Sequence, residues 1–153
     1  MTKGNSAGMD TSDREIVSSR VFDAPRELVF KAWTDPDHLK HWWGPKGFTN
    51  TFHEFDARPG GVWRFVMHGP DGTDYQNESI FVEIVRPERI VFDHVSGPRF
   101  RATVTFTGQA GKTLVDWRML FETAAEYDKV KGFAVEGNRQ NLDRLEERLR
   151  KME

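Results

Sequence analysis

The stretch TAAEYDKVKGFAVEGNRQNLDRLEERLRK, residues 123–151, contains no proline and is rich in helix-forming residues. Thr123 suits the N-cap of a helix, and Glu126 stands three residues later, where a capping box places its second member. Small and apolar residues recur at helical spacing along the segment, at Val130, Ala134, Gly137, Leu145 and Leu149. This pattern predicts one long amphipathic helix, whose apolar stripe must pack against another layer of the fold.

Upstream of this helix, residues 48–121 are a series of short β-type segments separated by turns rich in Gly and Pro. This alternation of short β-type segments and turns predicts an antiparallel meander of about six strands. A further strand is expected at residues 14–22, and two short helices should follow it. Pro25 and Pro36 suit the first turns of these two helices.

The order of these elements predicts an α+β fold, in which a curved antiparallel sheet of six to seven strands wraps around the long C-terminal helix. An antiparallel sheet of this length twists and curls, and its concave face needs a cover. A cavity between sheet and helix would be a natural site for an apolar ligand. Residues 1–13 are small and polar, so we expect a disordered tail followed by a single domain over residues 14–153.

The chain has 153 residues, a formal net charge of -2 and no cysteine. The balanced charge and the lack of a basic stripe argue against a nucleic-acid or membrane-surface partner. Without cysteine there is no disulfide, no thiol nucleophile and no cysteine-based zinc site. No apolar run is long enough to span a bilayer, and the first residues lack the apolar core of a signal peptide, so we expect a cytoplasmic protein.

Four segments together, residues 20–48, 59–75, 81–95 and 103–123, resemble the SRPBCC superfamily in their order and spacing. They include the motifs DAPRELVFKAW, PGGVWRF and LVDWRMLF. More narrowly, they resemble the bacterial branch described as activator of heat-shock protein 90 ATPase homologue-like, from residue 14 to the end of the chain. The resemblance implies the helix-grip fold of START lipid-binding and pollen-allergen-like domains, with a cavity for small apolar or amphipathic molecules. The superfamily includes binders, cyclases, dehydratases and oxygenase subunits, so no single reaction is implied.

Strand alternation selects the side chains that would line this cavity. If TGQAGK forms the last turn, Val104 faces Val115 and Ala102 faces Trp117, which puts both apolar sets on one face. These residues suit a packed core and a cavity wall equally well. The candidate ligand-binding residues are Trp43, Trp63, Phe65, Phe100, Ala102, Trp117, Met119, Phe133, Asn138 and Asn141.

Two pairs of residues bear on this cavity in particular. Trp42 and Trp43 end the second short helix, and adjacent helical residues point roughly 100° apart. We therefore expect one ring to pack the helix against the sheet and the other, that of Trp43, to border the cavity entrance. Asn138 and Asn141 fall within the apolar stripe of the long helix, and buried amides need partners from strands, water or a ligand.

Among the carboxylates, Glu54 and Glu78 are the candidates for a general acid or base. Simple pairing of residues 48–55 with residues 62–68 would place Glu54 near Trp63, and a buried carboxylate has a raised pKa that suits acid–base catalysis. A bulge at Gly60-Gly61 would instead leave Glu54 in solvent, and we favour this because buried acids are rare.

In residues 75–85, Ile80, Val82 and Ile84 suggest one inward-facing set, and Glu78 belongs to it. His94 is the third weak catalytic candidate, although a lone histidine is more often structural. The facing of His94 depends on the turn before its strand.

Metal and cofactor sites are not predicted. His38 and His41 have helical spacing, but no third ligand is evident, and no Gly-rich phosphate loop is present. The leading hypothesis is a module that binds a small apolar or amphipathic molecule. The alternatives are a cyclase, dehydratase or hydrolase-like enzyme, and a chaperone partner that stimulates a heat-shock protein 90 type ATPase, as the family name implies. An exposed edge strand could also form a homodimer.

Overall fold

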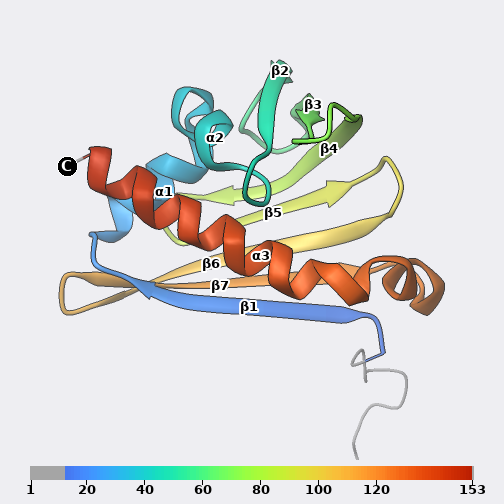
Figure 1. Cartoon of the computed structure of the whole chain (residues 1–153). Helices are drawn as coiled ribbons and strands as arrows, with labels where there is room; N and C mark the ends of the chain where they lie inside the picture. The colour runs from blue at the N-terminus through green and yellow to red at the C-terminus, as the bar shows by residue number, and fades with distance from the viewer. Residues whose placement is uncertain (1–12, 153) are drawn as a thin grey trace, which may run out of the picture.

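The computed structural model describes residues 13–152, which form one antiparallel sheet of seven strands with three helices (Figure 1). The predicted tail lies outside the described residues, apart from Asp13. The elements in chain order are β1 (Glu15–Phe22), α1 (Arg26–Thr34), α2 (Pro36–Trp42), β2 (Thr49–Phe55), β3 (Val62–His68), β4 (Asp74–Val85), β5 (Arg89–His94), β6 (Phe100–Gln109), β7 (Lys112–Phe121) and α3 (Ala124–Met152).

The strand order across the sheet is β1-β7-β6-β5-β4-β3-β2, so β1 and β2 are its two edges. In Figure 1, α3 crosses one face of the curved sheet, over β1 and β7, and its C-terminal half meets α1 and α2. This face is the concave one, and it carries the core. The predicted helix-grip α+β fold is therefore confirmed.

The hairpin between β6 and β7 is tighter than the sequence suggested. Its turn consists of Ala110 and Gly111, both at positive φ (52° and 84°), which matches the two-residue turns that fit the twist of a hairpin. Ala102 consequently lies opposite Met119, and Val104 lies opposite Trp117. The expected pairs, Val104 with Val115 and Ala102 with Trp117, were wrong by two residues. A shift of two keeps every side chain on its face, so the apolar sets still meet on the concave side.

A bulge in β4 changes which of its residues face inward. The register shifts between Phe81 and Glu83, which leaves Val82 as the extra residue. Ser79 and Phe81 are buried on the concave face, whereas Ile80 and Val82 are exposed. Ile80 and Val82 were therefore wrongly placed in the inward set, whereas Ile84, its third member, packs against the core beyond the bulge.

The helix α3 starts as expected but packs unevenly along its length. The hydroxyl of Thr123 accepts a hydrogen bond from the backbone N–H of Glu126 at 3.1 Å. The carboxylate of Glu126 accepts from the backbone N–H of Arg99 instead, which ties the helix start to the turn before β6. The buried apolar residues of α3 all lie in its C-terminal half, at Leu142, Leu145 and Leu149. Within the described residues, no helix combines the length and apolar character of a membrane span.

Candidate functional site

All five tryptophans of the chain form one continuous cluster between the helices and the concave face. Trp33 at the end of α1 contacts Trp42 and Trp43, with ring centroids 4.8 and 5.7 Å apart. Trp43 reaches the sheet, where its ring lies 5.1 Å from Trp63 on β3 and 5.6 Å from Trp117 on β7. Tryptophans as far apart in sequence as Trp33 and Trp117 thus pack into one aromatic cluster.

Trp42 and Trp43 contact different parts of the fold because α2 ends between them. Trp42 is helical and only 1% exposed, and its indole N–H donates to the carbonyl oxygen of Ala32 at 3.0 Å. Trp43 has extended backbone (φ -68°, ψ 133°), which turns its ring away from α2 and toward the sheet. Trp42 therefore joins α2 to α1, and Trp43 joins both helices to β3 and β7.

Three indole N–H groups of this cluster have no hydrogen-bond partner among the described residues. They belong to Trp33, Trp63 and Trp117, and all three side chains are at most 3% exposed. An indole can only donate, and a buried donor without an acceptor costs about 1–3 kcal/mol. The amide oxygen of Asn141 on α3 is also buried and has no partner among residues 13–152. Three of the six buried side-chain polar atoms without a partner in the described part of the chain are therefore indole donors.

A short polar strip crosses the concave face beside Trp63. Ser79 on β4 lies opposite Trp63 on one neighbouring strand and opposite His94 on the other. The Ser79 hydroxyl is buried and has no partner within the described part of the chain. His94 Nδ1 lies 2.8 Å from the carbonyl oxygen of Pro98, and Nε2 lies 2.8 Å from Oδ1 of Asn77. Burial lowers the pKa of His94, and the hydrogen bond to Pro98 opposes this in part.

The two asparagines of α3 occupy the buried stripe as expected. Asn138 Nδ2 contacts the sulfur of Met119 on β7 at 3.3 Å and the hydroxyl of Ser18 on β1 at 3.4 Å. Asn138 therefore has partners on the sheet, whereas Asn141 keeps a free carbonyl oxygen. No Asp, Glu, Lys or Arg is fully buried among residues 13–152, so this interior carries polar groups without formal charge.

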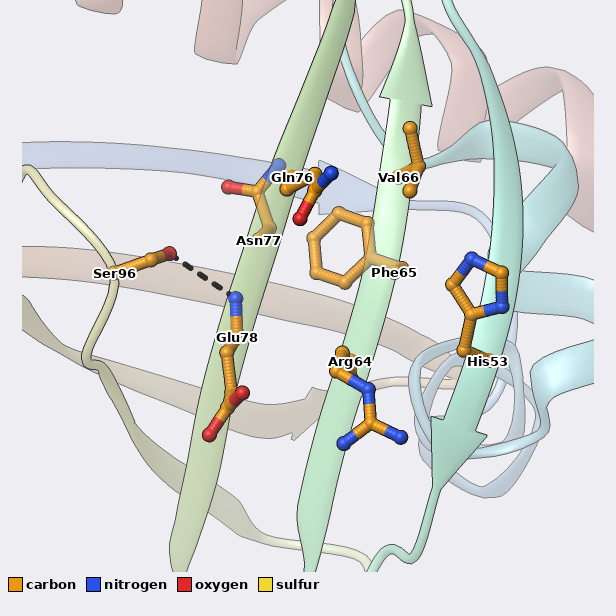
Figure 2. Close-up of a pocket in the computed structure, with 8 residues that line it drawn as sticks. All are labelled: His53, Arg64, Phe65, Val66, Gln76, Asn77, Glu78 and Ser96. Atoms are coloured by element: carbon orange, nitrogen blue, oxygen red, sulfur yellow. Dashed lines mark hydrogen bonds between the residues drawn. The ribbon is translucent and has the colours of Figure 1, made fainter.

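Among the surface pockets of the described part of the chain are two that no residue of α3 lines. The first, of about 310 Å³, lies along the convex side of β2, β3 and β4 (Figure 2). Its polar side chains include Arg64, Gln76 and Glu78, and Glu78 donates its backbone N–H to Ser96 at 3.1 Å. The second, of about 400 Å³, lies at the ends of β5, β6 and β7. A cavity between sheet and α3 thus remains a prediction.

Residues 23–150 match the model of a protein family described as Activator of Hsp90 ATPase homolog 1-like protein. The chain belongs to this family. None of the curated proteins compared with it matches.

Solved structures support the same assignment of the fold. A protein of Arthrobacter aurescens is 26% identical, with a TM-score of 0.85 over 93% of this chain and 89% of the other. A protein of Nitrosomonas europaea is 21% identical, with a TM-score of 0.84 over 93% and 97% of the two chains. An AHSA1 protein of Silicibacter pomeroyi is 20% identical, with a TM-score of 0.74 over 91% and 99%.

In this member of the Hsp90-activator-like family, the three acid–base candidates do not meet. The bulge of β2 falls at His53, so Phe52 still faces Phe65, but Glu54 pairs with Arg64 on the convex side. The carboxylate of Glu54 lies 3.1 Å from the guanidinium of Arg64, and both side chains are about half exposed. The simple pairing that would place Glu54 beside Trp63 does not occur, and Glu54 faces solvent as we favoured. The bulge responsible lies in β2 rather than at Gly60-Gly61.

Glu78 also lies on the convex side, opposite Arg64, because the inward set of β4 contains Ser79 instead. Of the three candidates, His94 alone faces the concave interior. His94 stacks on Phe100, with ring centroids 4.8 Å apart and planes 14° from parallel.

The candidate ligand-binding residues are only partly brought together. Trp43, Trp63 and Trp117 are in the cluster, Phe65 stacks on Trp63 at 4.7 Å, and Ala102 opposes Met119 on the same face. Phe100 lies farther along β6, against His94. Phe133 on α3 is 65% exposed, so it does not belong to the buried interface, and a role in ligand contact remains a prediction.

The structure adds Trp33, Ser79 and Asn77 to the site, and no sequence pattern had singled out any of the three. An inward set of Ile80, Val82 and Ile84 would turn Ser79 outward by simple alternation, and the bulge at Val82 turns it inward instead. No group of three or more His, Asp or Glu side chains within the described residues is arranged to hold a metal ion. His38 instead accepts a hydrogen bond from Arg148 at 3.2 Å.

Proposed function

We propose that this protein binds a small apolar or amphipathic molecule between the concave face of the sheet and α3. The observation that carries the proposal is the set of buried indole N–H groups of Trp33, Trp63 and Trp117, which have no acceptor among the described residues. A ligand oxygen would satisfy donors that the chain itself leaves unpaired. Burial of ligand carbon against the tryptophan rings would provide affinity at about 25 cal/mol per Å².

The interior also limits the kind of ligand. It has no buried charged side chain among residues 13–152, and burial disfavours the charged form of His94. An isolated charge buried there would be costly, whereas a neutral acceptor would match the indole donors. The expected ligand is therefore mostly carbon, with one or two uncharged oxygen acceptors.

The first experiment compares native and denatured mass spectra of the gently purified protein. A ligand held in the interior adds mass in the native spectrum only, and that mass begins to identify it. The identified molecule, or a panel of neutral apolar molecules with and without a carbonyl oxygen, is then titrated while tryptophan emission is recorded. Because all five tryptophans touch, binding at this site should change the emission.

Two variants locate the binding site within the cluster. Trp117→Phe removes an unpaired N–H and keeps an aromatic ring, so it should weaken binding of acceptor-bearing ligands about tenfold, as one lost hydrogen bond implies. Trp42→Phe is the matched control, because its N–H is already bonded to Ala32 and should not contact ligand. Equal effects of the two variants, or no retained mass and no emission change with any probe, would contradict the proposal.

A second candidate function follows from the family description. A co-chaperone of this type would raise the ATPase rate of a heat-shock protein 90 of the same source. Unchanged ATPase rates at saturating concentrations of this protein would exclude that role. An acid–base enzyme is less well supported, because Glu54 and Glu78 lie on the face opposite to His94.

A further inference from the structure

Among residues 13–152, no strand pairs with the outer edge of β1. The backbone N–H of Phe121 donates to the carbonyl oxygen of Arg14 at 2.8 Å, and these residues stand opposite each other when the β1–β7 register is continued by one. Hydrogen-bonded and non-hydrogen-bonded pairs alternate in an antiparallel ladder. The even-numbered residues of β1 therefore bond to β7, and the N–H and C=O groups of Val17, Ser19 and Val21 point to the open edge.

This edge lacks the features that normally prevent strand pairing. The other edge strand, β2, has a bulge at His53 and is packed against α2. β1 has neither bulge nor proline, and both of its charged side chains are engaged within the molecule. Glu15 lies 3.2 Å from Arg118 on β7, and Arg20 lies 2.8 Å from Asp143 on α3. An unprotected strand of this kind is a template for another strand.

Exposed apolar side chains flank the same edge on both faces of the sheet. Val17 and Val21 are each 48% exposed on the convex side. Val135 on α3 is 61% exposed, and it stands one helical turn before Asn138, whose amide reaches Ser18 of β1. Three of the seven large apolar side chains that are exposed among the described residues thus border β1, which marks it as a contact surface.

We propose that two copies of this chain pair through β1 in antiparallel orientation, about a two-fold axis at Ser19. Val17 and Val21 stand two residues on either side of Ser19, so this axis places Val17 against the partner's Val21 in both halves of the interface. The Ser19 N–H and C=O groups bond to those of the partner's Ser19, and the two sheets become continuous. An axis at Ser18 would instead place Ile16 against the charged side chain of the partner's Arg20. The spacing of the valines therefore selects both the partner and the register.

Sedimentation equilibrium of the full chain between 1 µM and 1 mM tests the association. The wild-type protein should be a dimer at the upper concentrations. The double variant Val17→Lys/Val21→Lys should be monomeric, because it places four ammonium groups along the interface. The matched control is Val82→Lys, since Val82 is 40% exposed on the bulge of β4, away from this edge, and this variant should dimerise like wild type. Circular dichroism verifies that each variant is folded.

Cross-linking tests the register, and the chain is suited to it because it has no native cysteine. Ser19→Cys should form a disulfide-linked dimer under mild oxidation, because directly opposed residues have Cα atoms about 4.5–5.5 Å apart. Val17→Cys should not, because it lies four residues, or about 13 Å, from the same position in the partner. A wild-type chain that is monomeric at every concentration overturns the proposal. So does a dimer that survives the double lysine substitution and does not cross-link at residue 19.

Discussion

Arg144 on α3 donates a hydrogen bond of 2.9 Å to the carbonyl oxygen of Gly44, one hundred residues earlier in the chain. The same guanidinium donates to the carbonyl oxygens of Trp43 at 3.2 Å, Pro45 at 2.9 Å and His41 at 3.0 Å. Arg144 is partly buried, and burial lowers the pKa of its guanidinium. The Arg144 side chain therefore donates hydrogen bonds to the backbone carbonyls at the end of α2. These bonds tie α2 to α3 beside the tryptophan cluster.

Replacing this arginine should loosen the contact between α2 and α3. Arg144→Met leaves up to four carbonyl oxygens without a charged donor, and we expect it to lower the free energy of unfolding by about 2–4 kcal/mol. Arg144→Lys should cost about half as much, because an ammonium cannot span all four oxygens. Urea unfolding measures both, with the exposed Arg150→Met as a control expected within about 0.5 kcal/mol of wild type. A loss below about 1 kcal/mol for Arg144→Met would show that the bonds are weak in solution.

A side chain at Gly44 should destabilise the fold. Its φ is +99°, and a Cβ would approach Cε of Met67 to 2.7 Å. We expect Gly44→Ala to cost about 2–3 kcal/mol, from backbone strain and crowding together. Gly60→Ala is the control, since Gly60 has φ +84° and no atom within 4 Å of the added Cβ, so it carries the strain alone. Thermal unfolding of both variants should rank Gly44→Ala as the less stable. Equal melting temperatures would mean that Met67 moves away freely.

Within the tryptophan cluster, bonded and unbonded indoles should respond differently. Trp42→Phe removes the bond to Ala32 as well as ring volume, whereas Trp63→Phe removes an unpaired N–H. In ligand-free protein, Trp42→Phe should therefore lower the free energy of unfolding by about 1–2 kcal/mol more than Trp63→Phe. Guanidinium unfolding gives this difference. The reverse order would indicate that the Trp63 N–H has an acceptor in solution.

Burial of His94 should make stability depend on pH. Because the pKa of His94 is lowered in the folded state, the unfolded chain takes up this proton first as pH falls. Stability should therefore decline as pH drops below the unfolded value of about 6.5, until the folded protein also binds the proton. We expect His94→Gln to show a shallower decline between pH 7 and 5 than wild type. Parallel curves for the two proteins, from urea unfolding at each pH, would contradict this.

The ion pair of Glu54 and Arg64 should contribute little to the free energy of unfolding. Both side chains are about half exposed, and surface pairs of this kind are worth about 0–1 kcal/mol. Glu54→Gln should thus leave the unfolding free energy within about 1 kcal/mol of wild type and leave ligand binding unchanged. A large loss of binding would place Glu54 at the site after all, contrary to its position on the convex face.

Alternation in the sequence was sufficient to find the concave set of β6 and β7, because a register error of two residues leaves every side chain on its face. It failed for β2 and β4. In each of these strands a single extra residue, His53 or Val82, reverses the alternation, and no local pattern marks where it occurs. Glu78 and Ser79 were placed on the wrong faces of β4 for that reason, and simple pairing of β2 would have placed Glu54 inward.

The sequence by itself determined the order of the elements, the length of the C-terminal helix and the family, since these depend on local periodicity and on motifs read along the chain. Only the tertiary structure decided that Trp33 and Trp117 share one cluster, that their N–H groups lack acceptors, and that Arg144 bonds to Gly44. The physical reason is that hydrogen-bond partners and ring contacts depend on distances between residues far apart in sequence. Those distances are set by turns, bulges and the way α3 packs on the sheet.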